Sequence, residues 1–221
     1  MYKPLKIERN LPFNIISNKM DFRNTPLYHS IVAVISVLLV LILYFAGIDF
    51  GRAVAGMAFF LLFLTLIIGP VMRLWRPSLE ALPWNLPWSW RGELGIWFTI
   101  FSVFHVLLIF DSSHWDIAGY LAGMRLSDLA ALVAIFWSLV LTVASFTRVI
   151  KFLGISAWRW LHSFAYVIFY LVGAHVINHA FLRADRPSDW LHWMYLLMII
   201  IVIILQTVAF IKTVVNYRRN G

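Results

Sequence analysis

The chain of 221 residues contains no cysteine and few charged residues. Without cysteine, disulfides, iron–sulfur clusters, thiolate metal sites and cysteine nucleophiles are all excluded. Charged residues make up 13% of the sequence, about half the share found in soluble domains. Hydrophobic residues make up 62%, and the mean hydropathy is +0.84. This composition excludes a soluble globular domain and predicts a protein whose solvent is lipid.

The apolar residues fall into six runs, each long enough to cross about 30 Å of hydrocarbon as a helix. We therefore predict an all-α integral membrane bundle of six helices. The predicted spans are Leu27–Ile48, Ala53–Met72, Gly92–Phe110, Asp128–Thr147, Trp158–Leu182 and Trp190–Ile211. Residues 1–26 and 212–221 then form basic tails on either side of a membrane domain at 27–211.

Acidic residues are scarce and the net charge is +8, which in a soluble protein would favour a nucleic-acid partner. Here most Lys and Arg lie in the two tails, the second loop and the fourth loop, whereas the other loops hold most of the Asp. Because positive loops stay in the cytoplasm, we expect both termini there. The prediction is a multi-pass membrane protein, in contact with lipid and not with nucleic acid.

Ionisable side chains inside a span are costly and mark function, and three histidines lie at matched depths on two of the predicted spans. His105 and His175 have apolar neighbours and fall at similar depth toward the non-cytoplasmic side of the third and fifth spans. His162 begins the fifth span, and Arg91 begins the third at the matching depth. Along a helix, Arg91 lies about 20 Å from His105, and His162 lies about 20 Å from His175. Two opposed imidazoles can hold a haem iron, so the pattern favours two haem levels.

Helical rotation limits this interpretation of the fifth span. A step of 13 residues turns His175 about 140° away from the face of His162. The two rings therefore align only if the span is locally tightened or bent, which Gly173 could ease, or the two haems lie on different sides of the span. His179 is an alternative haem ligand, and the pair His175 and His179 could instead bind a small metal. We expect no intramembrane carboxylate to accompany that pair. His29, His114 and His192 are expected to lie at interfaces without a functional role.

These histidines and their surroundings resemble the ferric-reductase-like transmembrane domain superfamily. Within it, the chain is most similar to the haem-binding membrane subunits of bacterial periplasmic methionine-sulfoxide reductase systems. The matching residues are Arg91-Gly92-Glu93-Leu94-Gly95, His105, Leu153-Gly154, Trp158-Arg159, Leu161-His162, Tyr166 and His175. The resemblance covers residues 51–210.

The resemblance implies one or two b-type haems. His105 and His175 match the ligands of the outer haem, and His162 matches a ligand of the inner haem. Arg91 stands where eukaryotic members carry a second histidine, and a protonated guanidinium is no normal iron ligand. It could instead pair with a haem propionate.

The function implied is electron transfer across the bacterial inner (plasma) membrane to a periplasmic redox protein, such as a methionine-sulfoxide reductase. No glycine-rich dinucleotide fingerprint follows a strand, so we expect a separate donor on the cytoplasmic side. That donor is a flavin reductase or a quinol, which would bring FMN or a quinone to the chain.

Three alternatives remain at this stage. One is a stand-alone reductase of ferric chelates or oxygen. Another is a haem-free membrane carrier that uses histidine as a proton relay. Carriers tend to have broken spans, and no break is evident in this sequence. The third is a structural membrane scaffold.

Overall fold

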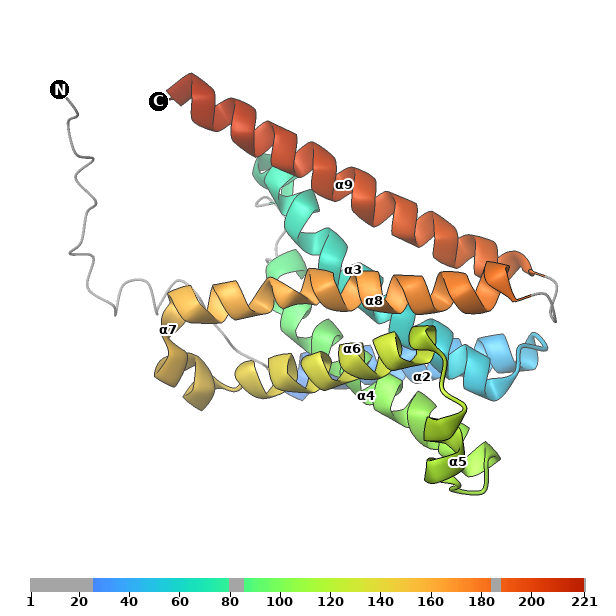
Figure 1. Cartoon of the computed structure of the whole chain (residues 1–221). Coiled ribbons are helices and arrows are strands. Elements are labelled where there is room, and N and C mark those ends of the chain that lie inside the picture. The colour runs from blue at the N-terminus through green and yellow to red at the C-terminus, as the bar shows by residue number, and fades with distance from the viewer. Residues whose placement is uncertain (1–25, 80–85, 184–187, 221) are drawn as a thin grey trace.

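The computed structural model describes residues 26–79, 86–183 and 188–220, and in these ranges it is all-helical (Figure 1). The expected tail at residues 1–26 lies outside the described residues, except for Pro26. The elements are α2 (Pro26–Phe45), α3 (Phe50–Leu79), α4 (Leu86–Ser112), α5 (Ile117–Ala122), α6 (Leu126–Ala144), α7 (Thr147–His162), α8 (Phe164–Ile177), the π-helical turn η1 (Asn178–Leu182) and α9 (Trp190–Asn220).

Six segments of this structure are long and apolar enough to cross a membrane, which confirms the predicted number of spans. They are Pro26–Phe45, Phe50–Trp75, Trp90–Ser112, Leu126–Ala144, Thr147–Leu182 and Trp190–Arg219. A helix satisfies its backbone hydrogen bonds internally, as hydrocarbon requires. Many large apolar side chains, such as Ile42, Phe136 and Phe210, remain exposed on the bundle surface. The chain is therefore a multi-pass membrane protein whose outer surface contacts lipid.

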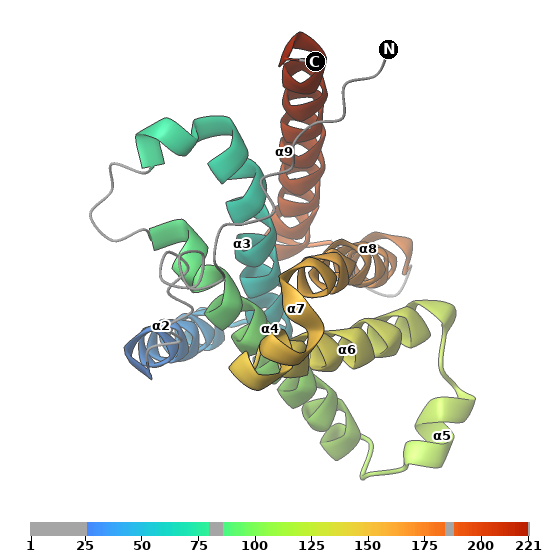
Figure 2. The same ribbon diagram turned by 90° about the vertical axis from the view of Figure 1, so that its left-hand side faces the viewer.

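Helix α3 lies at the centre of the bundle and is the most deeply buried span (Figure 2). It packs against α2, α4, α8 and α9. Phe59 of α3 stacks on Phe169 of α8 at 6.0 Å between ring centroids, and it meets Tyr195 of α9 edge-on at 5.4 Å. These contacts tie three spans together near the end of the bundle where α3 begins.

The fifth span departs from a regular α-helix at three places. Gly154 has φ 76° and ψ 156°, values that only glycine adopts readily, and the chain turns there (Figure 1). A further break at Ser163 separates α7 from α8, and α8 passes into η1 at Asn178. Of these three places, only Ser163 lies between His162 and His175, and it directly follows His162. The breaks in the fifth span were not evident in the sequence.

Gly173 is not the site of the bend, contrary to expectation. Helix α8 is regular across it, from Phe164 to Ile177. A methyl group at Gly173 would lie 3.6 Å from Cδ1 of Ile199 on α9. Gly173 therefore faces α9, and a methyl group there would make an ordinary van der Waals contact.

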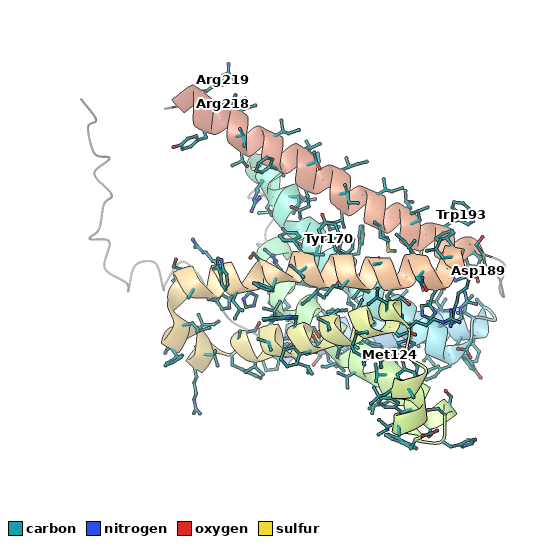
Figure 3. All side chains as sticks on the ribbon, in the orientation of Figure 1. Met124, Tyr170, Asp189, Trp193, Arg218 and Arg219 are labelled. Carbon is teal, nitrogen blue, oxygen red and sulfur yellow. The ribbon has the colours of Figure 1, made fainter. Side chains whose placement is uncertain are left out.

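The two ends of the bundle carry different side chains. Asp189 and Trp193 lie at one end, whereas Arg218 and Arg219 lie at the opposite end of α9 (Figure 3). Helix α9 runs without interruption to Asn220, so residues 212–220 extend the last span.

Candidate haem or metal site

One cavity of about 250 Å³ opens among the spans at the end of the bundle that contains Asp189. Residues of α3, α4, α6, α8, η1 and α9 line it, and we call it the histidine cavity. Its polar lining consists of Arg52, Ser102, His105, His175, His179, Arg183, His192 and Tyr195. Much of the remaining wall is small, with Ala55, Ala58, Ala131 and Ala180. Four of the chain's seven histidines therefore face one space.

His105 and His175 reach the cavity from different helices, α4 and α8. Nδ1 of His175 lies 3.0 Å from the carbonyl oxygen of Ser127. A carbonyl only accepts, so Nδ1 of the neutral ring carries the proton and Nε2 keeps its lone pair. Nδ1 of His105 is buried, and no group in the described part of the chain hydrogen-bonds to it. Each ring thus retains a nitrogen able to bind a metal ion.

His179 is held differently, because both of its ring nitrogens have partners. Nε2 lies 2.6 Å from Oδ1 of Asp128, and Nη1 of Arg183 donates to Nδ1 at 3.0 Å. The arginine fixes Nδ1 as the acceptor, so Nε2–H donates to the carboxylate. His175 is therefore better suited than His179 to bind a haem iron.

Asp128 corrects one expectation from the sequence. No carboxylate was expected beside His175 and His179, yet Oδ1 of Asp128 lies 3.5 Å from Nδ1 of His175 as well. Asp128 is in the first turn of α6, and its Oδ2 accepts from the backbone N–H of Arg125, 3.4 Å away. Together, Asp128, His175 and His179 offer ligand atoms that all lie within 4.8 Å of one another.

His192 was expected to lie at an interface without a functional role, but it lines the cavity. The backbone N–H of Asp189 donates to its Nδ1 at 3.0 Å. The Asp189 carboxylate also accepts from Nη2 of Arg52 at 2.5 Å and from the backbone N–H of His192 at 3.2 Å. Burial alone would raise the pKa of Asp189, but these donors outweigh it and hold the pKa below its ordinary value.

This lowered pKa predicts a pH-dependent contribution to stability. The ion pair should contribute fully above pH about 4, the ordinary range of an aspartate, and should weaken as pH falls through the lower folded-state value. Because both side chains are about one-third exposed, we expect about 0.2–1 kcal/mol. Thermal unfolding in detergent at several pH values should show Asp189→Asn below the parent at pH 7, with the difference shrinking toward pH 3. A constant difference would contradict the assignment.

The other end of the bundle holds the second pair of expected residues, Arg91 and His162. Arg91 hydrogen-bonds to Tyr166 of α8, and its charge also acts on the ring of His162. Nδ1 of His162 donates to the carbonyl of Trp158 at 3.0 Å, and Nε2 lies 3.2 Å from the hydroxyl of Ser145. The structure thus brings Arg91 and His162 near each other, away from the histidine cavity.

No role was expected for Glu93, but its side chain is fully buried, with 0% exposure. Neither of its carboxyl oxygens has a hydrogen-bond partner within the described ranges. Buried acids inside a span are costly and mark functional positions. Glu93 was recognisable before folding was considered, because it is an acid within an apolar span.

No model of a known protein family matches the chain, and no curated protein matches it. The arrangement of side chains is therefore the basis for a functional assignment.

Proposed function

We propose that the protein is a membrane electron carrier that holds a b-type haem in the histidine cavity. The observation that carries the proposal is that His105 and His175, on separate spans, both line this cavity, and that each ring keeps a nitrogen with no hydrogen-bond partner among the described residues. Bis-imidazole ligation from facing helices is a common way to hold haem in a bundle.

The rest of the cavity fits such a group. The hydrogen bond from His175 to Ser127 is the kind of outer contact that fixes the orientation and basicity of a metal-bound imidazole. The alanines of the wall leave space for a flat macrocycle, and the apolar lining limits water. Arg52 and Arg183 offer positive charge for its carboxylates. When bound, haem would supply one-electron exchange between ferric and ferrous iron.

The opposite end supports a second haem level. Nε2 of His162 keeps its lone pair because Nδ1–H is held by Trp158. Arg91 is well placed to pair with a propionate, and it cannot act as a ligand. We propose that electrons enter at this end from a flavin reductase or a quinol and leave from the histidine cavity to a periplasmic protein. A methionine-sulfoxide reductase is one such acceptor.

The orientation follows from charge. Arg218 and Arg219 lie at the end opposite Asp189 (Figure 3). Under the positive-inside rule, that basic end faces the cytoplasm of a bacterial cell, together with both termini. The histidine cavity then opens toward the periplasm.

An optical spectrum tests the proposal. Protein purified in detergent from cells supplied with haem should give a b-type difference spectrum on reduction with dithionite. Quantified haem per chain should be one, or two if both levels fill. Protein that is folded but has no reducible haem absorbance would overturn the proposal.

A further inference from the structure

Asp128, His175 and His179 form a compact set of metal-binding side chains beside the histidine cavity. Oδ1 of Asp128 lies 2.6 Å from Nε2 of His179 and 3.5 Å from Nδ1 of His175. We propose that these three residues bind a divalent transition-metal ion of the zinc class. The ion would use Nδ1 of His175, whereas the proposed haem would use Nε2 of the same ring.

The geometry suits a small ion. Zinc bonds to nitrogen and carboxylate oxygen are about 2.0–2.2 Å, so ligand atoms around one tetrahedral ion lie about 3.4 Å apart. The observed separations bracket that value, and modest side-chain rotation closes the difference. Two imidazoles and one carboxylate are a donor set that zinc and ferrous iron both accept. All three side chains are partly exposed, His175 by 24%, Asp128 by 15% and His179 by 31%, which gives an ion a path to the site.

Helix structure places the three ligands. His175 and His179 are four residues apart, and the switch from α8 to η1 falls between them. Asp128 is positioned by the first turn of α6, where its carboxylate accepts from the N–H of Arg125. The contact spans 51 residues of sequence, so the site depends on α6 packing against α8.

Arg183 competes with the metal. It donates to Nδ1 of His179, which leaves the ring proton on Nε2, the nitrogen that would bind the ion. Metal binding therefore moves that proton to Nδ1 and turns the guanidinium away. Removing the arginine should make binding tighter, because it eliminates both a positive charge and the competing hydrogen bond.

The site also shares His175 with the proposed haem, and this consequence rests on the proposed function. A neutral imidazole has one lone pair. An ion at Nδ1 displaces the hydrogen bond to Ser127 and leaves the proton on Nε2. Metal and haem should therefore exclude each other at His175.

Binding of Co²⁺ to the purified full-length chain, followed by its visible absorption and by calorimetry, tests the site. We expect one ion per chain, displaced by Zn²⁺. Asp128→Asn and His179→Ala should each weaken binding at least tenfold, whereas Arg183→Gln should strengthen it. In protein prepared without haem, His192→Ala is the matched control, because it removes a cavity histidine that neither proposed site uses, and it should bind as the parent does. Asp128→Glu keeps the carboxylate and should retain binding. It provides the comparison if Asp128→Asn folds poorly.

Unchanged binding in folded Asp128→Asn and His179→Ala would overturn the site, as would equal loss in His192→Ala. A chain that binds Co²⁺ as expected but never contains haem would refute the proposed function and leave this site standing. Zn²⁺ added to the haem-loaded parent should lower its haem content, and the same addition to Asp128→Asn should not.

Discussion

His105→Ala should lose the haem of the histidine cavity, with haem content there falling at least about tenfold. Loss of an outer contact alone typically costs 10–100-fold in metal affinity, and this change removes the ligand itself. His175→Ala should have the same effect, because in the proposed site each ring would supply one nitrogen to the iron. The measurement is haem per chain by reduced-minus-oxidised spectroscopy on purified protein.

His179→Ala is the matched control for this prediction. It lies one turn from His175 and lines the same cavity, but both of its ring nitrogens are hydrogen-bonded to Asp128 and Arg183. We expect the variant to keep its haem. Haem retained in His105→Ala and lost in His179→Ala would reassign the ligands.

Gly56→Ala should destabilise the bundle by about 1–3 kcal/mol, the usual cost of overpacking. A methyl group at this position of α3 would collide with the hydroxyl of Tyr195 on α9. The tyrosine has little freedom to move, because its side chain is buried and its ring contacts Phe59. The measurement is thermal unfolding in detergent, and haem content should fall as well, since Tyr195 lines the cavity.

Gly173→Ala provides the comparison. Gly173 also faces α9, but its added methyl group would meet Ile199 at an ordinary contact distance of 3.6 Å. Alanine also has the higher helix propensity, by about 1 kcal/mol. We therefore expect unchanged or higher stability. Equal effects of the two substitutions would show that steric fit with α9 is not what Gly56 provides.

The spans were predictable because the requirement they satisfy is local. A run of apolar residues long enough to cross lipid forms a helix whatever its neighbours are. The depth of His105 and His175 followed from the same runs, and the structure brings both to one cavity. Whether they bind haem stays a prediction.

The partners of these residues were not predictable, because they come from distant parts of the chain. Asp128 hydrogen-bonds to His179, which is 51 residues away in the sequence, and the neighbouring residues of neither one predict this contact. No role was expected for His192 because it lies at the start of a span, yet the first turn of α9 brings it into the wall of the cavity. Helical rotation indicated that the fifth span could be bent between His162 and His175, but it could not locate the irregular residues, and Gly173 lies in a regular part of α8.

The π-helical turn at Asn178–Leu182 has a consequence for how such a protein could evolve. A turn of this kind holds one more residue than the α-helical turn it replaces, so it is what a single-codon insertion leaves in a helix. Everything before the turn, including His175, keeps its register, while the residues within and after it are rotated. A lineage could therefore gain or lose the positions of His179 and Arg183 beside Asp128 in one genetic step, without disturbing the axial histidines.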